Sequence, residues 1–179
     1  MSGLLIRTMD FKCPSILVPL YISKVRALLE YGNVVWCPFK KKDINVIEKV
    51  QQHFTKYITG MYNFNYNERL TRLKLPSLEY RRIRGDLIET YKILNNMHDP
   101  KTTKSLLTLD ENSLTRCHNF KLKKFRVNYK PYQMFYTNRI VNRWNRLPMH
   151  IVNADSLNSF KNKIDKHFSD IMFKTNIEI

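Results

Sequence analysis

Apolar residues recur at intervals of three and four along much of this chain, and this spacing is the feature that most constrains its fold. The longest example runs from a cap at Ser77 to about Asn96, and its predicted buried stripe is Tyr80, Ile83, Leu87, Tyr91 and Leu94. Such spacing lines up side chains on one face of an α-helix. Only four glycines occur in 179 residues, which argues against a turn-rich β-barrel and against phosphate-binding glycine loops. We therefore predict a mainly α fold, a small helical bundle.

Five further segments are predicted to be helical, at residues 14–31, 43–59, 66–73, 133–146 and 156–168. In the first of them Pro19 should kink the helix or delay its start, and Leu28 is expected to face inward. The second should begin at a cap on Asp43 and bury Ile44, Ile47, Val50, Phe54 and Ile58. The residues predicted to be buried are Tyr136, Ile140, Trp144 and Leu147 for the helix at 133–146, and Leu157, Phe160, Ile164 and Phe168 for the helix at 156–168. Residues 33–39, apolar and aromatic around Trp36, are expected to form a buried connection.

Residues 119–129 have a different pattern, in which apolar and basic side chains alternate. Alternation with a period of two is typical of a β-strand, and the single slip at Lys123 and Lys124 is what a β-bulge requires. We predict a short strand or hairpin arm here, with one apolar and one basic face. Residues 98–114, rich in Thr and Ser with Pro100, are predicted to be a linker or surface loop between residues 1–97 and residues 115–179.

The chain carries a net charge of +16, and more than half of the excess lies in residues 115–148, which contain nine basic residues and no acidic one. We interpret this concentration as a surface that faces a polyanion, with solubility alone as the alternative. On the helix at 133–146 the arginines repeat at spacings of 4 and 3 and form one stripe. The candidate nucleic-acid contacts are Lys121, Lys123, Lys124, Arg126, Arg139, Arg143 and Arg146.

An alternative remains both for the arginine stripe and for the aromatic residues near it. The arginine stripe is also compatible with a helix face whose side chains pair with acids elsewhere in the fold. Most Tyr and Phe residues are expected in the core, but Phe125, Tyr129 or Tyr132 are candidates for stacking on bases.

Signs of catalysis are missing from the sequence. There is no P-loop, no glycine-rich nucleotide turn, no serine elbow, and no cluster of carboxylates for a two-metal site. Cys117 and His118 suggest zinc, but neither a CxxC nor an HxxxH pair accompanies them. We predict a protein that is not an enzyme, with no catalytic residue, no metal and no cofactor.

The chain is expected to be an intracellular protein. Its three widely spaced cysteines fit a reducing compartment rather than a disulfide framework. No signal peptide is recognisable, and the longest apolar run, residues 14–22, is short and contains two prolines, so no membrane partner is expected.

Five segments occur here in an order that is similar to a known family. They are LEYGNVVWCP (29–38), KKDINVIEKVQ (41–51), NERLTRLKLPSLEYRRIRGDLIETYKIL (67–94), NRIVNRWNRLP (138–148) and SLNSFKNKID (156–165). Together they resemble the C-terminal, post-palm region of the endonuclease and reverse transcriptase polyprotein of non-LTR (LINE-class, jockey-like) retrotransposons. The resemblance covers nearly the whole chain except the last residues, 172–179.

The resemblance implies a role in holding nucleic acid. In that family the polymerase aspartates and the endonuclease lie upstream, so no catalytic residue is carried over to this chain. Residues 1–97 would be thumb-like or post-palm, and the partners would be RNA or DNA and a reverse transcriptase palm absent from this chain, in the nucleus or the cytoplasm. The alternatives are a helical protein-interaction module or a decayed transposon remnant without a selected function.

Overall fold

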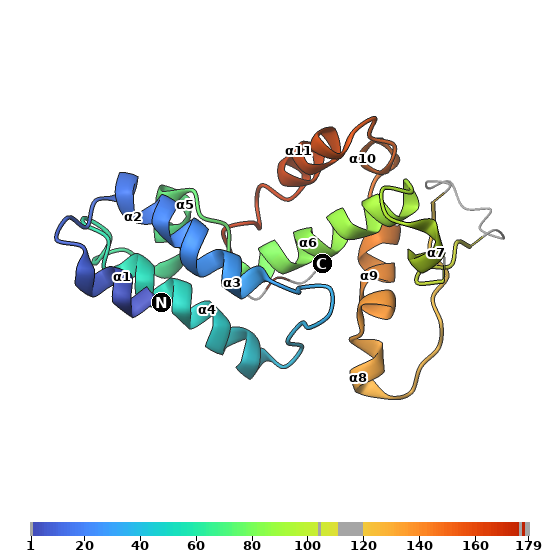
Figure 1. Ribbon diagram of the computed structural model, residues 1–179, viewed down its shortest axis with the longest axis horizontal. Coiled ribbons are helices and arrows are strands. Elements are labelled where there is room, and N and C mark those ends of the chain that lie inside the picture. The colour runs from blue at the N-terminus through green and yellow to red at the C-terminus, as the bar shows by residue number, and fades with distance from the viewer. Residues whose placement is uncertain (1, 104, 111–119, 176, 178–179) are drawn as a thin grey trace. The chain divides into compact units, whose positions relative to one another are not determined.

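The computed structural model describes residues 2–103, 105–110, 120–175 and 177 (Figure 1). These residues form two compact units. The first unit contains residues 2–32, 38–82, 169–175 and 177, and the second contains residues 33–37, 83–103, 105–110 and 120–168. The longest helix, α6 (Leu78–Leu94), begins in the first unit and continues into the second.

Helices make up most of the described chain, so the predicted mainly α fold is confirmed. The first unit contains α1 (Ser2–Thr8), α2 (Pro14–Tyr21), a π-helical turn (Ile22–Arg26), α3 (Ala27–Glu30), α4 (Lys41–Lys56), α5 (Tyr66–Leu73) and the start of α6. The second contains the rest of α6 and α7 (Pro100–Thr103), α8 (Lys130–Gln133), α9 (Tyr136–Asn145), α10 (Met149–Val152) and α11 (Leu157–His167). No helix among the described residues combines the length and the apolar character needed to span a bilayer.

The predicted strand is reduced to a single antiparallel bridge between Leu109 and Leu122. Two backbone hydrogen bonds flank it, from Asp110 to Lys121 and from Lys123 to Thr108, both 2.8 Å long. The rest of the arm, up to Tyr129, is extended chain without a ladder, and Asn119 lies outside the described residues. Of the apolar residues in the alternating pattern only Leu122 is buried, whereas Phe120, Phe125 and Tyr129 are exposed, so the predicted apolar face is not buried in a sheet.

Pro19 lies inside the first predicted helix, and an irregular turn follows it. It lacks an N–H and its ring crowds the preceding turn, and the chain then widens into the π-helical turn at Ile22–Arg26. The wider turn rotates the following residues out of the predicted register. Leu28 is consequently 61% exposed, so its predicted inward position is wrong.

Helix α4 begins three residues earlier than predicted, with Lys40 rather than Asp43 at the N-cap. Phe54 and Ile58 are buried as predicted, but the first three apolar positions of the stripe are only half-buried. A polar stripe at spacings of 3 and 4 is buried instead, and it consists of Glu48, Gln51 and Thr55. The apolar core of the first unit gathers around this stripe, from α1, α2, α4 and α5.

Each member of the polar stripe is hydrogen-bonded, as buried polar groups must be. Gln51 accepts a hydrogen bond from the Tyr21 hydroxyl and donates one to the carbonyl of Pro76, both at 3.0 Å. Thr55 Oγ1 accepts from Arg69 Nε at 3.2 Å. The stripe thereby joins α2, α5 and the chain that leads into α6.

The Glu48 carboxylate is the anchor of α6 in the first unit. It accepts hydrogen bonds from the Tyr66 hydroxyl at 2.5 Å and from the backbone N–H groups of Leu78 and Glu79 at 3.2 Å. The first N–H groups of a helix lack partners within the helix and carry partial positive charge, so an anion is favoured there. Ser77, the predicted cap, accepts from the Tyr80 N–H at 3.2 Å. Burial raises the pKa of Glu48, and the hydrogen bonds that it accepts oppose this rise only in part.

The second unit packs the inward faces of α6, α9 and α11 together. Ile83, Leu87 and Tyr91 of α6 are buried as predicted. Also buried as predicted are Tyr136, Ile140, Trp144 and Leu147 of the α9 region, and Phe160, Ile164 and Phe168 of the α11 region. Leu157, which was predicted to be buried as well, is only half-buried. The ring of Phe160 stacks on Tyr91 with centroids 4.2 Å apart and contacts Trp144 at 5.9 Å.

The raised pKa of Glu48 gives the stability of the chain a defined pH dependence. The folded state retains the proton above the pH at which an unfolded glutamate releases it, so stability falls as pH rises from that value through the raised pKa. Glu48→Gln removes this titration. The free energy of unfolding of the variant relative to the unaltered chain should therefore increase with pH across that interval. Urea denaturation followed by far-ultraviolet circular dichroism at several pH values measures this, and a pH-independent difference would contradict it.

Candidate nucleic-acid interface

Helix α9 carries the predicted arginine stripe, and its position in the second unit decides what those arginines do. The predicted helix at 133–146 corresponds to α9, which begins only at Tyr136, because Gln133 is the last residue of α8 and Met134 and Phe135 join the two helices. Helix α9 ends before Pro148, as predicted. Its buried residues lie toward α6 and α11, and its flanks lie toward the 33–37 segment and the 120–129 segment.

Arg139 forms a buried, two-pronged ion pair with Asp86 of α6. Its Nε lies 2.8 Å from Asp86 Oδ2, and one terminal nitrogen lies 2.8 Å from Asp86 Oδ1. The side chains are only 7% and 1% exposed. The same guanidinium donates to the carbonyls of Asn33 at 2.9 Å and Met134 at 3.2 Å. Burial alone would lower the pKa of Arg139, but the hydrogen bonds and charge of Asp86 outweigh it and leave that pKa raised.

Arg139 therefore does not belong to an exposed basic stripe, and the sequence interpretation is corrected at this position. The N–H groups of this guanidinium donate to Asp86, Asn33 and Met134, so they are not available to bind a phosphate in a two-pronged manner. The alternative interpretation, an arginine paired with an acid elsewhere in the fold, holds here. The acid was not identifiable from the sequence, because Asp86 and Arg139 are 53 residues apart.

Gly85 leaves space for Asn33, a residue that hydrogen-bonds to this ion pair. A Cβ at Gly85 would lie 2.9 Å from Asn33 Nδ2, the atom that donates to Asp86 Oδ1 at 3.0 Å. The close neighbour of Gly85 is thus a side chain of the 33–37 segment. The absence of a side chain at Gly85 leaves room for the amide that orients Asp86.

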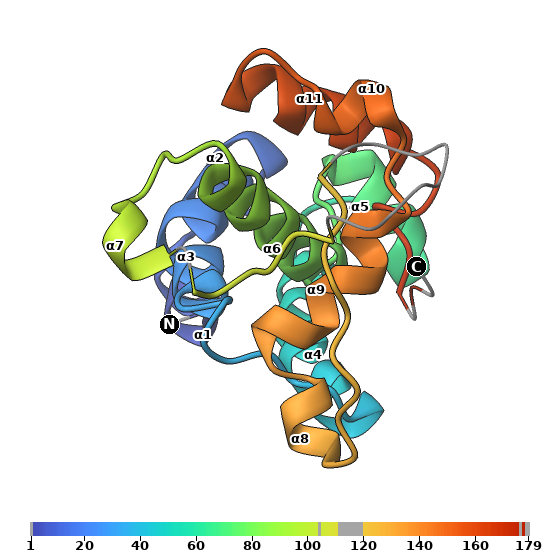
Figure 2. The same ribbon diagram turned by 90° about the vertical axis from the view of Figure 1, so that its right-hand side faces the viewer.

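Residues 120–122 are clamped to the C-terminal half of α9. The Asn145 side chain accepts from the Leu122 N–H at 2.9 Å and donates to the Leu122 carbonyl at 2.8 Å, in the manner of a neighbouring strand. The indole N–H of Trp144 donates to the Phe120 carbonyl at 2.8 Å. Further along, Gln133 of α8 donates to the Val127 carbonyl at 2.6 Å. The segment thus runs antiparallel to α9 and α8, as Figures 1 and 2 show.

The other two arginines of the stripe lie nearer the surface. Arg143 is half-buried and Arg146 is exposed. Successive residues of an α-helix are about 100° apart, so Arg143 lies about 200° around α9 from Asn145, on the flank opposite the 120–129 segment. Arg146, about 100° from Asn145, is the arginine closer to that segment. These two arginines of the predicted stripe therefore lie on different flanks of α9.

The clamped segment together with α8 and Phe135 forms what we call the basic–aromatic arm, residues 120–135. Its exposed cations are Lys123, Lys124, Arg126 and Lys130, and its exposed rings are Phe120, Phe125, Tyr129, Tyr132 and Phe135. Lys121 is half-buried. Lys123 Nζ lies 5.8 Å from the centroid of the Phe125 ring, and the rings of Tyr132 and Phe135 are parallel with centroids 6.3 Å apart. Cations and aromatic faces therefore share one surface.

Two contributors to this surface were not identified from the sequence. Phe135 was assigned to a helix, but it is the N-cap of α9 and its ring is exposed. Nothing in the sequence indicates that Asn145 holds the 120–122 segment, because its hydrogen-bond partner is the backbone of a residue 23 positions away.

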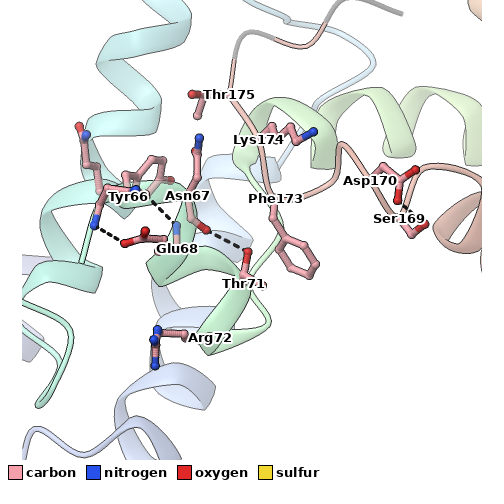
Figure 3. Close-up of a pocket in the computed structure, with 12 residues that line it drawn as sticks. Tyr66, Asn67, Glu68, Thr71, Arg72, Ser169, Asp170, Phe173, Lys174 and Thr175 are labelled. Carbon is pink, nitrogen blue, oxygen red and sulfur yellow. Dashed lines mark hydrogen bonds between the residues drawn. The ribbon is translucent and has the colours of Figure 1, made fainter.

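A cavity of about 900 Å³ lies in the first unit, between α5 and residues 169–175 (Figure 3). The carboxylates of Glu68 and Asp170 come from opposite sides of it and have local partners, the Asn65 N–H at 3.0 Å and the Ser169 hydroxyl at 3.4 Å. Its charged groups have both signs and do not converge, so it does not compete with the arm as a polyanion site.

No metal centre is present among the described residues, where no three His, Cys, Asp or Glu side chains are grouped. Cys13 and Cys37 are not joined in a disulfide bond, and they belong to different units. Cys117 and His118 lie outside the described residues.

Comparisons with protein-family models, with curated proteins and with solved structures gave no match to this chain.

The Asp86–Arg139 pair should be essential for the stability of the second unit. Arg139→Met leaves a buried carboxylate without its cation, and we expect a decrease of about 3–5 kcal/mol in the free energy of unfolding. Asp86→Leu combined with Arg139→Met should recover much of that decrease, because no unpaired charge remains. Arg146→Met, at an exposed position, should change stability by no more than about 0.5 kcal/mol. Tryptophan fluorescence in urea is the measurement, since Trp36 and Trp144 both lie in the second unit.

Asn145→Ala should release the arm while leaving α9 intact. The variant deprives a buried N–H and a buried carbonyl of their partner, at a cost of about 1–3 kcal/mol for each group left unpaired. Trypsin should then cut faster after Lys121, Lys123 and Arg126. Asn142→Ala, an exposed position on the same helix, is the control. Equal cleavage rates in both variants would show that Asn145 does not hold the arm.

Proposed function

We propose that this chain binds single-stranded RNA or DNA through the basic–aromatic arm and has no catalytic activity of its own. The observation that carries the proposal is the arm itself, where four exposed cations are interspersed with exposed aromatic rings. Cations attract the phosphate backbone, and aromatic rings stack on bases regardless of sequence. Duplex DNA hides its base faces, so the exposed rings favour a single strand.

The electrostatic setting supports the same proposal. No acidic residue occurs between residues 115 and 148, so the sequence of this region contains no anion that would compete with phosphate for the arm's cations. Among the predicted contacts, Lys123, Lys124, Arg126 and Arg146 are exposed, and they are the residues that we propose to meet phosphates. Lys121 and Arg143, half-buried, are proposed as secondary contacts.

The family resemblance suggests the source of that strand. We propose that the chain is a non-catalytic C-terminal fragment of a non-LTR retrotransposon reverse transcriptase, in which the arm holds template RNA or target DNA in the nucleus or cytoplasm. Primer extension by the purified chain would contradict the absence of polymerase activity.

A protein partner is the second candidate, supported by one specific observation. The 33–39 segment, predicted to be buried, instead leaves Val35 78% and Trp36 43% exposed. Leu17, by contrast, is fully buried and Leu20 is half-buried. An exposed aromatic and aliphatic segment fits a surface that once packed on a polymerase palm, or one that serves a helical interaction module. A decayed remnant without a selected function is the remaining alternative.

The proposed function predicts a salt-dependent affinity that resides in the arm. We expect the triple variant Lys123→Glu/Lys124→Glu/Arg126→Glu to bind a single-stranded oligonucleotide much more weakly. The slope of log affinity against log salt should become shallower by about 0.7 for each phosphate that is no longer neutralised, or about 2 for three phosphates. Fluorescence anisotropy over a series of salt concentrations measures both quantities.

A matched control separates the arm from net charge. Lys40→Glu/Lys41→Glu/Lys42→Glu makes the same change of charge at three exposed lysines before and in the first turn of α4. It should retain most of the affinity and of the salt slope. Equal weakening in both triple variants would indicate a diffuse charge effect, and binding that does not depend on salt would refute the proposed function.

A further inference from the structure

A small cavity of about 280 Å³ lies in the second unit where the arm meets α9 and residues 105–108. Its apolar wall comes from Leu107, Leu122 and Val141, which are buried. The exposed rings of Phe125, Tyr132 and Phe135 also line it, together with Lys123. An apolar interior bordered by several aromatic faces and a cation is suited to a flat, unsaturated ring that is attached to a phosphate.

The wall of the cavity is held in place by hydrogen bonds. The bridge between Leu109 and Leu122 and the 2.8 Å bond from the Lys123 N–H to the Thr108 carbonyl tie the 105–110 segment to the arm. The Asn145 clamp ties the arm to α9. The cavity is therefore shaped by three segments that are joined to one another.

Polar groups are placed to contact the edge of a ring. Asn138 lines the cavity, and its Nδ2 donates to the Tyr132 carbonyl at 2.9 Å. This bond uses one of the two N–H groups of the amide, so the amide offers a ligand its second N–H as a donor and Oδ1 as an acceptor. Ser105 and Thr137 add hydroxyl groups to the lining, and none of the lining residues that the structure describes is acidic.

The size of the cavity limits what it can hold. Its volume is just below the range of roughly 300–1,000 Å³ that is usual for small-molecule pockets. It suits a single base with part of its sugar better than a dinucleotide cofactor.

We propose that this cavity receives one unstacked base of the bound single strand, with the adjoining phosphate on Lys123. This inference rests on the proposed function and makes it more specific. The arm would hold the backbone through charge, and the cavity would contribute an affinity that depends on the presence of a base.

Two oligomers and a cavity-filling variant test this proposal. The oligomers are a single strand of about ten nucleotides, within the usual site sizes for single-strand binding, and an abasic strand with the same number of phosphates. Thr137→Phe places a ring in the cavity and leaves every cation and rim ring in place. Asn142→Phe, at an exposed position of α9 that does not line the cavity, is the control.

The unaltered chain and the Asn142→Phe control should bind the base-bearing strand about tenfold more tightly than the abasic strand, as expected for one stacked base. Thr137→Phe should lose most of that preference and keep its affinity for the abasic strand and its salt slope. Tyr132→Ala, which removes an exposed rim ring and leaves the buried wall unchanged, should reduce the preference in the same direction. Circular dichroism verifies that both variants are folded.

The outcomes separate this inference from the proposed function. An unchanged preference in folded Thr137→Phe and Tyr132→Ala would overturn the cavity proposal, while salt-dependent binding of both strands would leave the proposed function standing. Equal affinity of the unaltered chain for the two strands would also overturn the cavity proposal. Failure of the unaltered chain to bind either strand would refute the proposed function and this inference together.

Discussion

The ion pair between Asp86 and Arg139 is the interaction on which the second unit depends. Two charges taken out of water are tolerated only with close geometry and further hydrogen bonds, and here Asn33 and Met134 supply them. The pair sets the position of α9 against α6. Through Trp144 and Asn145, α9 in turn sets the position of the arm and of the cavity beside it. The proposed binding surface is thus supported by an arginine that takes no part in binding.

The first unit also contains a buried acidic side chain, but hydrogen-bond donors rather than an arginine surround it. Glu48 is buried and accepts hydrogen bonds from a tyrosine hydroxyl and from the N-terminus of α6, where the helix itself supplies partial positive charge. Gln51 and Thr55 continue this polar stripe along α4. In both units, therefore, a buried acidic side chain determines how α6 is held, once at its first turn and once near its middle.

Local and long-range properties of the chain differ in how far they could be predicted. Period and capping are local, so α5 was predicted with its bounds, and the residues predicted to be buried in the α9 and α11 regions are buried except for Leu157. Which polar side chain is buried is not a local property. Glu48 and Arg139 look like surface residues in the sequence, because their partners lie 30 and 53 residues away. For the candidate site, Lys123, Lys124, Arg126 and Arg146 are exposed as the interpretation requires, whereas Arg139 is not.

By itself, the sequence determined that this chain is mainly helical, that its charge is concentrated in residues 115–148 and that aromatic residues occur among those charges. These are consequences of local spacing and composition. Only the tertiary structure decided which cations reach solvent, that the basic segment is clamped to α9, and that a cavity opens between this segment and residues 105–108. The reason is that burial and pairing depend on contacts between distant residues, and a pattern of three and four along the chain contains no information about them.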